Sequence, residues 1–394
     1  MAISTKIQNY MERASWIRKM FEQGIELKAK LGADRVFDFS LGNPNLEPPD
    51  QVRKTILEVM GDERPGKHAY MPNAGLKESR EAVASFLAKE HGVPITWEHV
   101  IMTCGAGGAL NVALKTILDQ GDEVVVLSPY FVEYLFYADN HNGVGKLAKT
   151  NEDFTLNMDE IESAITPKTK AIILNSPNNP SGRIYDENSL RKLGRLFEKI
   201  KEKNNQTIHI LSDEPYSKIV YDGVTVPSIF KVYADSIIAT SYSKDLSLPG
   251  ERIGYLAVNP RMENWKQVID GLTFCNRILG FVNAPALMQR ILIKLQGVTV
   301  NVSEYKWKRD HLCRGLADAG YSFIKPEGAF YLFPKSPIAD DVKFVNFLLQ
   351  ENILAVPGTG FGTPGYFRLA YCVADKVIEG SLAGFRRAIQ KTSP

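Results

Sequence analysis

Short apolar runs alternate with longer segments of helical periodicity between about residues 97 and 260. Short runs rich in β-branched residues are typical of buried strands, and apolar positions three and four residues apart are typical of helices packed on a sheet. The alternation predicts an α/β fold with a mostly parallel sheet and crossover helices. Strands are expected at 100–104, 123–127, 171–175, 208–212, 236–241 and 254–258, and helices at 76–91, 108–119 and 189–204.

The pattern changes after residue 285, where a long helical stretch runs to about residue 317. Short β-type runs and helices then alternate, which predicts a smaller α+β domain. A helix over 5–31 is expected to pack on it. The β-type runs lie at 37–41, 321–324, 330–333, 353–356 and 366–370, and the helices near 342–351 and 376–391.

The length of 394 residues exceeds the usual size of a single core, so two domains are expected. Residues 46–285 would form the large domain, and residues 1–45 with 286–394 the small one. Hydrophobic residues make up 44% and charged residues 23% of the chain, as in an ordinary globular protein. The formal charge of +2 is spread without blocks, which argues against nucleic acid and membrane surfaces as partners.

The four cysteines show no paired spacing, and this favours a reduced, cytoplasmic protein without a cysteine metal site. The first twenty residues carry several charges, so they do not resemble a signal peptide. No window approaches the ~20 apolar residues of a membrane-spanning helix.

Polar clusters follow the predicted strands directly, and in parallel sheets ligands bind at the carboxyl ends of strands. Gly105-Ala106-Gly107-Gly108 opens a helix, where backbone N–H groups and the helix dipole favour a phosphate. A tight turn would explain the same glycines. The segment lacks the spacing of a nucleotide P-loop and of a dinucleotide-binding loop.

The next two clusters offer an aromatic face and amides. Phe131, with Tyr130 before it, can stack on a planar ring, although an aromatic residue there can also belong to the core. In the turn after residue 175, Pro180 and Gly182 are explained by turn formation. The adjacent Asn178 and Asn179 are not, and an amide there can donate to a phenolate oxygen.

Asp213 follows a buried strand, where a carboxylate needs a partner such as a protonated pyridine nitrogen. The alternative is a helix N-cap. Lys244 ends the Ser-Tyr-Ser-Lys segment after strand 236–241, and its burial would lower the lysine pKa as a Schiff-base lysine requires. A solvated lysine is the alternative. Arg252 and Ser241 suit a phosphate, and Arg368 in an apolar strand requires a carboxylate, internal or from a substrate.

These clusters together suit a phosphorylated pyridine aldehyde. They resemble the fold-type I pyridoxal-phosphate enzymes, specifically the class I aminotransferases related to aspartate aminotransferase. The resemblance spans about residues 41–368 and rests on the segments NNPSG, DEPY, SYSK with an arginine eight residues later, and FRLA. It implies a mostly parallel seven-stranded sheet with helices on both faces, and a ping-pong transfer of an amino group between an L-amino acid and a 2-oxo acid.

The resemblance also implies residue roles. Lys244 would be the covalent anchor and the proton carrier, and Asp213 would pair with the pyridinium nitrogen. The substrate carboxylate would bind Arg368 with Asn179 and the backbone near Gly42. Tyr70 would reach the phosphate of a partner subunit, which implies a homodimer with shared active sites. The remaining cofactor contacts would come from Ala106, Gly107, Phe131, Asn179, Tyr216, Ser241 and Arg252.

Other activities on the same fold stay open, chiefly a β-lyase, a cyclopropane-forming synthase or a decarboxylase. An acyl-CoA-condensing relative would carry histidine in place of Tyr216, and a regulator would need an additional N-terminal DNA-binding module. The substrate side chain is not identified. Arg18, Lys19 and Arg277 are candidates for a second carboxylate, whereas Trp16, Ile17 and Tyr331 would suit an apolar pocket.

Overall fold

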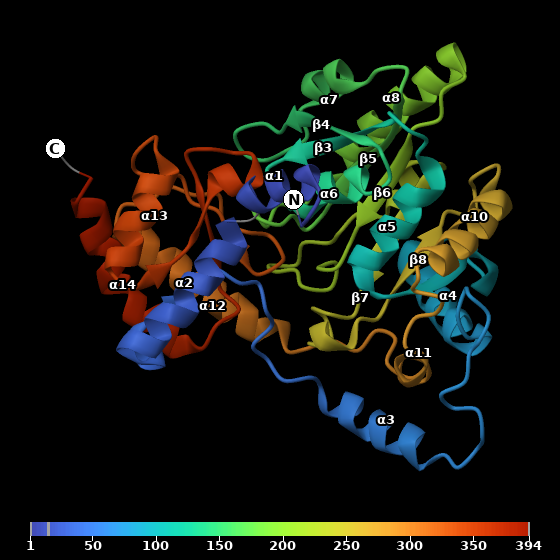
Figure 1. Ribbon diagram of the computed structural model, residues 1–394, viewed down its shortest axis with the longest axis horizontal. Helices are drawn as coiled ribbons and strands as arrows, with labels where there is room; N and C mark the ends of the chain where they lie inside the picture. Colours follow the sequence, from blue (N-terminus) through green and yellow to red (C-terminus); the bar gives the residue numbers. More distant parts are fainter. Residues whose placement is uncertain (1, 14–15, 393–394) are drawn as a thin grey trace.

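A seven-stranded sheet lies at the centre of the larger part of the protein (Figure 1). The computed structural model describes residues 2–13 and 16–392. The strand order is β2-β8-β7-β6-β5-β3-β4, and β8 runs antiparallel to β2 and β7 while the other described pairs are parallel. The strands are β2 (Val100–Thr103), β3 (Glu123–Ser128), β4 (Val144–Lys149), β5 (Thr169–Asn175), β6 (His209–Asp213), β7 (Ser236–Ser241) and β8 (Gly254–Val258).

The mostly parallel sheet is confirmed, and each of the six strands expected between residues 100 and 258 is present. The seventh, β4, was not located from the sequence. It lies at the sheet edge and contains Lys146 and Lys149, while Val144 and Leu147 are about half exposed. A charged edge strand lacks a continuous apolar run because only one side of it is covered, and the charges discourage pairing with other chains.

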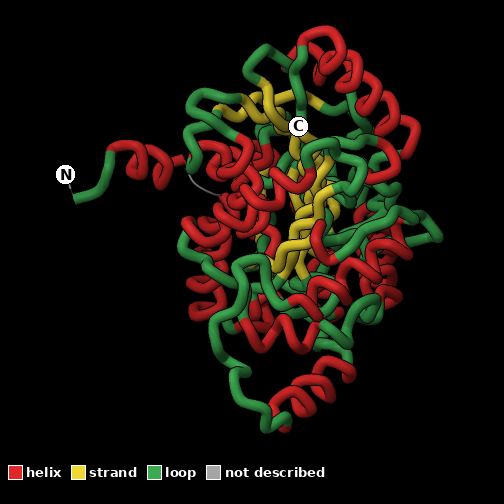
Figure 2. Tube along the Cα trace, turned by 90° about the vertical axis from the view of Figure 1, so that its right-hand side faces the viewer, coloured by secondary structure: helices red, strands yellow, loops and turns green. Residues whose placement is uncertain are grey.

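Helices cover both faces of this sheet (Figure 2). Alternate strand residues point to opposite faces, so Met102 and Val125 join one buried cluster while Ile101 and Val124 join another. The first cluster includes side chains of α4 (Lys77–His91), α8 (Glu187–Asn204), α9 (Ile229–Val232) and α11 (Ala286–Leu292). The second includes side chains of α5 (Gly105–Ile117), α6 (Glu133–Asp139) and α10 (Trp265–Ile278). The short helix α7 (Met158–Ala164) contacts β4.

The C-terminal third builds a separate buried cluster, which also takes in Met20 and Phe39 from the N-terminal segment. Its strands form the sheets β1-β10 and β11-β12-β9. The run 321–324 is not a strand, contrary to expectation: Tyr321 N bonds back to Leu316 O and closes the preceding helix. The elements are β1 (Phe37–Asp38), β9 (Tyr331–Leu332), β10 (Ile353–Leu354), β11 (Val356–Pro357), β12 (Phe367–Ala370), α12 (Val302–Asp318), α13 (Asp341–Gln350) and α14 (Asp375–Gln390).

Two predicted helices are each divided. The stretch 285–317 contains α11 and α12, and the segment between them bonds Val300 N to Asp245 O. The stretch 5–31 contains α1 (Thr5–Arg13) and α2 (Trp16–Leu31). The prediction that this whole stretch packs on the smaller part is wrong for α1, because the rings of Tyr10 and Phe136 lie 5.0 Å apart and tie α1 to α6.

Helix α3 (Asp50–Gly61) lies at the periphery of the protein (Figure 1), where it contacts α11. It buries Val52 and Thr55, whereas Leu57 and Met60 are 64% and 50% exposed. Among the described residues, no helix has the length and apolar character needed to span a membrane.

Candidate active site

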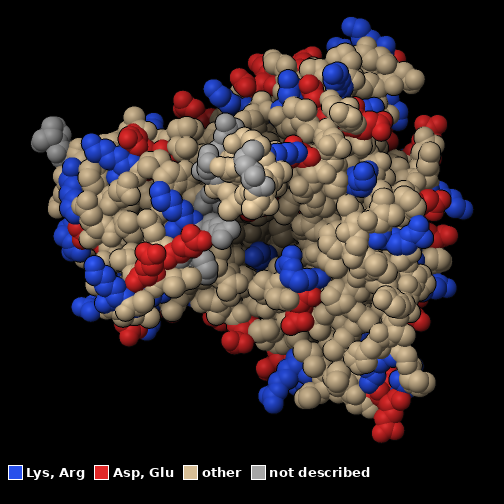
Figure 3. Space-filling model, in the orientation of Figure 1, with Lys and Arg blue, Asp and Glu red and all other residues tan. Residues whose placement is uncertain are grey.

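The carboxyl ends of the parallel strands and the first turn of α5 surround a cavity of about 320 Å³. The space-filling view shows the surface hollowed between the larger and smaller parts, with basic side chains inside the hollow (Figure 3). Eleven predicted site residues line this cavity, namely Gly42, Ala106, Gly107, Phe131, Asn179, Asp213, Tyr216, Ser241, Lys244, Arg252 and Arg368. Tyr70 does not line it: its side chain is 91% exposed.

Lys244 reaches the cavity from the turn that follows β7. Its Nζ donates a hydrogen bond of 2.9 Å to Gly42 O and lies 5.6 Å from the centre of the Phe330 ring. Burial lowers the pKa of the Lys244 ammonium to about 8, because a low-dielectric surrounding disfavours the charged form. Lys244 is thus partly buried rather than fully solvated, and a fraction of Nζ is neutral near neutral pH.

Asp213 ends β6 with one carboxylate oxygen paired and the other free. Oδ2 accepts a hydrogen bond of 2.5 Å from Tyr134 Oη, whereas the buried Oδ1 has no partner among the described residues. Burial raises the pKa of Asp213 to about 7, against the opposing effect of the Tyr134 hydrogen bond. No described helix begins at Asp213, so the N-cap alternative is wrong. An unpaired buried oxygen indicates a donor from a ligand.

The first turn of α5 and Arg252 form the anion-binding end of the cavity. The helix begins at Gly105, three residues before its predicted start, so Ala106 and Gly107 lie in its first turn with free N–H groups. Gly105 adopts φ +72°, and a Cβ there would lie 3.1 Å from Nη2 of Arg252. A Cβ at Gly107 would lie 2.9 Å from Tyr137 Oη. The positive φ favours glycine at position 105, and a side chain at position 107 would crowd the Tyr137 hydroxyl.

Arg368, on β12, also lines the cavity and is buried. Nη1 donates to Asn179 Oδ1 at 3.1 Å, Nη2 donates to Ser40 O at 2.5 Å, and Nε has no partner among the described residues. The guanidinium carbon lies 4.8 Å from the Tyr331 ring centre. No described carboxylate forms an ion pair with Arg368, so its counter-charge must come from a ligand.

The two adjacent asparagines have different surroundings. Asn178 Oδ1 accepts hydrogen bonds from Ser181 N at 3.1 Å and Ser181 Oγ at 2.8 Å, so turn formation explains this residue. Asn179 lines the cavity, and its backbone N–H donates to Asn175 Oδ1 at 2.7 Å. The hydrogen bonds of the turn therefore hold Asn179 at the cavity, where it remains available to a ligand.

Aromatic side chains close the cavity. Phe131 lines it and Tyr130 does not, which favours Phe131 as the stacking residue. Tyr216 and Tyr331 share a hydroxyl–hydroxyl bond of 2.7 Å that joins the larger part to the smaller one. A side chain at Gly42 would collide with the Tyr331 hydroxyl. The sequence suggested Tyr331 as a lining residue, and it is one.

Helix α6 contributes three lining residues that sequence reasoning missed. Glu133, Tyr134 and Tyr137 face the cavity, with Glu133 and Tyr137 one helical turn apart. The helix has only seven residues and gives a weak periodic signal. The sequence offered one clue: α6 begins two residues after Phe131, in the segment that follows the carboxyl end of β3.

Apart from Tyr331, the described candidates for the substrate side chain do not line the cavity. Lys19 Nζ lies 4.6 Å from the Trp16 ring centre and the Arg277 guanidinium lies 5.2 Å from the Phe274 ring centre, and neither residue lines the cavity. Trp16 does not line it either, and a Cβ added at Gly360 would lie 3.2 Å from the Trp16 side chain. The side chains of Ile17 and Arg18 lie outside the described part of the structure.

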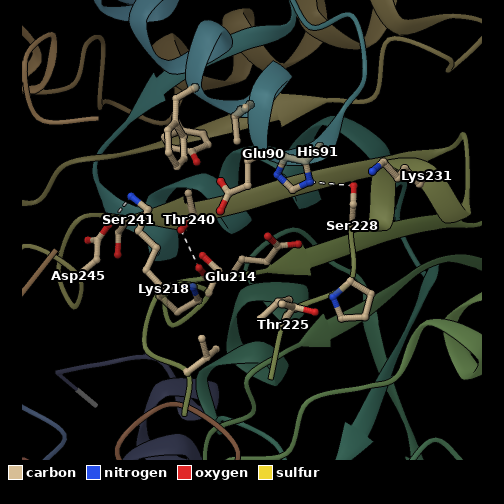
Figure 4. A pocket seen from close by; sticks show the side chains of 18 of the residues that line it. Glu90, His91, Glu214, Lys218, Thr225, Ser228, Lys231, Thr240, Ser241 and Asp245 are labelled. Carbon is tan, nitrogen blue, oxygen red and sulfur yellow. Dashed lines mark hydrogen bonds and ion pairs between the residues drawn. The ribbon is translucent and has the colours of Figure 1, made fainter. Parts of the chain in front are cut away.

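A second cavity, of about 410 Å³, shares Pro215 and Ser241 with the first (Figure 4). In it Lys218 Nζ pairs with Asp245 Oδ2 at 2.9 Å, and both side chains are largely buried. Asp245 directly follows Lys244, and its Oδ1 accepts from Leu246 N at 2.9 Å. The ion pair therefore anchors the chain segment that carries Lys244.

Comparisons with known proteins agree with this geometry. A family model described as aminotransferase class I and II matches residues 34–382. A probable aspartate aminotransferase of Methanocaldococcus jannaschii is 31% identical over 388 residues, 96% of this chain and 98% of the relative. The aspartate/prephenate aminotransferase of Thermus thermophilus is 32% identical, over 93% of this chain and 94% of the relative. A solved amino transferase from Eubacterium rectale superposes with a TM-score of 0.96 at 36% identity, covering all of both chains.

The residues present fit the cofactor of this family, pyridoxal phosphate. The unpaired Oδ1 of Asp213 suits the N–H of a pyridinium ring, and the first turn of α5 with Arg252 suits a phosphate. Lys244 Nζ stands in the same cavity and can form the covalent link. The chain thus belongs to the class I and II aminotransferases, and it is a pyridoxal-phosphate-dependent aminotransferase.

Proposed function

We propose that the cavity around Lys244 is the single site at which an amino group moves from an L-amino acid to a 2-oxo acid in two successive half-reactions. The observation that carries the proposal is the placement of a lysine with a lowered pKa, an unpaired carboxylate oxygen and an unpaired guanidinium nitrogen in one cavity. A covalent anchor, a pyridinium partner and a carboxylate receptor are the three functions that amino transfer requires.

The cofactor would be held by residues on every side of the cavity. Asp213 Oδ1 would accept from the ring nitrogen, and Tyr216 with Asn179 would donate toward the ring oxygen. Phe131 would lie against the ring face. The phosphate would bind Ala106, Gly107, Ser241 and Arg252. Pyridoxal phosphate supplies an aldehyde that takes up an amine and a ring that delocalises the electrons of a broken bond at the α-carbon.

Lys244 would act as proton carrier after it releases the cofactor. A pKa near 8 means that Nζ can take a proton from the α-carbon of the substrate and give it back at neutral pH. Arg368 orients that carbon, because a planar guanidinium binds the α-carboxylate through two parallel hydrogen bonds. The Asn179 and Ser40 contacts fix the guanidinium before the substrate arrives.

We further infer a homodimer with shared sites. Tyr70 is 91% exposed and α3 exposes Leu57 and Met60, which suits contact with a second copy of the chain. Tyr70 would then reach the phosphate of the partner's cofactor. Mixing Tyr70→Ala with Lys244→Ala tests this inference, since mixed dimers regain one intact site and about a quarter of the wild-type activity. No recovery from subunits shown to exchange would contradict it.

The location in the cell and the domain boundaries are two further parts of the proposal. The four cysteines are all free, which supports a reducing, cytoplasmic location. The division into domains is kept as 46–285 against 1–45 with 286–394, with adjustments at α1 and α11. The contact between Tyr10 and Phe136 ties α1 to α6 of the large domain. Met288 and Ile291 of α11 lie in the buried cluster on the sheet, so we assign α11 to the large domain.

The decisive experiment mixes the purified enzyme with single amino acids and follows the visible absorption of the lysine-bound cofactor. Conversion to the amino form of the cofactor, with release of the 2-oxo acid, supports amino transfer. Release of ammonia and pyruvate instead would indicate a β-lyase. Lys244→Ala is expected to lose the borohydride-reducible link and roughly 10²–10⁴-fold in rate. The exposed Lys192→Ala serves as the matched control.

A further inference from the structure

Glu133 is a partly buried acid in the active-site cavity, and one of its two carboxylate oxygens has no partner. It is the first residue of α6, and its side chain lines the cavity. Its Oε2 atom is buried and has no hydrogen-bond partner in the described chain. Burial raises the pKa of Glu133, and the hydrogen bond from its own backbone N–H and the charge of Arg368 oppose that effect without overcoming it. An acid kept in this state is costly unless a bound ligand pairs with it.

Glu133 has no charge partner when each of the other charged residues of the cavity is paired with a group of the cofactor or the substrate. The lining cations are Lys244, Arg252 and Arg368, and the lining acids are Asp213 and Glu133. In the proposed function Arg252 meets a phosphate, Arg368 meets the α-carboxylate and Asp213 meets a pyridinium nitrogen. Lys244 is either linked to the cofactor or carries the proton of the substrate α-carbon. Glu133 is thus the one lining charge for which neither the chain, as far as it is described, nor the cofactor supplies a partner.

Arg368 does not neutralise Glu133 directly. Both side chains line the cavity and each has an unpartnered buried atom, Oε2 and Nε. No ion pair joins these two described residues, although their charges act on each other across the cavity. A ligand that carries both charges can therefore pair with each of them. An amino acid with its carboxylate at one end and a cation at the other has that charge distribution.

We propose that Glu133 selects amino-acid substrates whose side chain ends in a cation, either an ammonium or a guanidinium. This inference rests on the proposed function, because it takes the α-carboxylate to be on Arg368. A cationic side-chain end would donate to Oε2 and keep Glu133 ionised. A side-chain carboxylate in the same place would face a like charge, or would require a proton on Glu133. Dicarboxylic amino acids are therefore disfavoured.

The test compares L-lysine and L-ornithine with L-norleucine, which has a chain of similar length without the charge, and with L-glutamate. Half-reaction kcat/KM values are measured for the wild-type holoenzyme and for Glu133→Gln, which keeps the shape and removes the charge. We expect the wild type to prefer the basic amino acids. The variant should lose roughly 10- to 100-fold on them, change little on norleucine and gain on glutamate. Glu379→Gln, at an exposed helical position, is the matched control.

A binding measurement tests the same inference without requiring turnover. The α-methyl analogues of lysine and norleucine lack the reacting hydrogen, and calorimetry gives their dissociation constants on the holoenzyme. A preference for the lysine analogue that disappears in Glu133→Gln supports the inference. Equal affinities, or a preference that survives the substitution, would overturn it. If the wild type converts norleucine and phenylalanine but not lysine, the inference fails and the proposed amino transfer stands. If no amino acid is converted, the proposed function fails, and the binding comparison still decides for Glu133.

Discussion

Tyr134 donates a hydrogen bond of 2.5 Å to Oδ2 of Asp213, and the two residues lie 79 positions apart in the chain. The bond holds the carboxylate so that Oδ1 remains unpaired. It also lowers the pKa of Asp213 against the larger effect of burial, which raises that pKa to about 7. Tyr134 therefore sets how readily Asp213 ionises to receive a pyridinium ring.

Removing this hydrogen bond should weaken cofactor binding most at low pH. In Tyr134→Phe the pKa of Asp213 rises further, so fewer molecules are ionised below pH 7. The ratio of the pyridoxal phosphate dissociation constants, variant over wild type, should be about 10 at pH 6 and should fall toward pH 8.5. Titration of the apoprotein with the cofactor measures it. Tyr185→Phe, at another buried tyrosine, should leave the ratio near 1. A pH-independent ratio for Tyr134→Phe would contradict this role.

Asp213 should make the stability of the apoprotein fall with rising pH. Its pKa is about 7 in the folded protein and about 3.9 in the unfolded chain, so the folded state binds the extra proton between these values. Stability is therefore lost as pH rises through that window and levels off above pH 7. In Asp213→Asn this loss is absent. The melting temperature of the variant minus that of the wild type should therefore increase from pH 5 to pH 7. A difference that does not change with pH would refute the assignment.

Replacing Arg368 by lysine should raise the KM for amino acids more than it lowers kcat. The variant keeps the positive charge but loses the fork that receives two carboxylate oxygens. We expect KM to rise roughly 10- to 100-fold, since charged hydrogen bonds contribute about 1.5–3 kcal/mol. Binding of a primary amine without a carboxylate is the internal control and should change little. An unchanged KM for amino acids would remove Arg368 from the substrate site.

The Lys218–Asp245 pair should be one of the interactions on which the Lys244 segment depends. Its atoms are 2.9 Å apart with little exposure of either side chain. Lys218→Met leaves a buried, unpaired carboxylate and should cost about 3–5 kcal/mol in the free energy of unfolding, measured in denaturant. Adding Asp245→Asn should recover much of that loss. The exposed pair Lys294–Glu58 offers a contrast, because Lys294→Met should cost less than about 1 kcal/mol.

Local patterns were sufficient for the strands and the strand-end motifs. A strand such as β7, buried at all six positions, appears in the sequence as a continuous apolar run because both of its faces are covered. The polar residues after β5, β6 and β7 converge because parallel strands place their carboxyl ends at one edge. Lys244, Asp213 and Asn179 were found on this basis, and all three line the cavity.

The sequence by itself determined the sheet, the order of the strand-end groups and the family, since these depend on neighbours within a few positions. Only the tertiary structure decided which groups pair across the chain. Arg368 meets Asn179 across 189 positions, Tyr134 meets Asp213, and Oε2 of Glu133 stays unpaired in the same cavity. Edge strand β4 and the short helix α6 were missed because their stability comes from packing on the sheet rather than from local periodicity. Pairing and burial at long range are properties of the assembled fold, and they set the pKa values and open hydrogen-bond positions on which the chemistry rests.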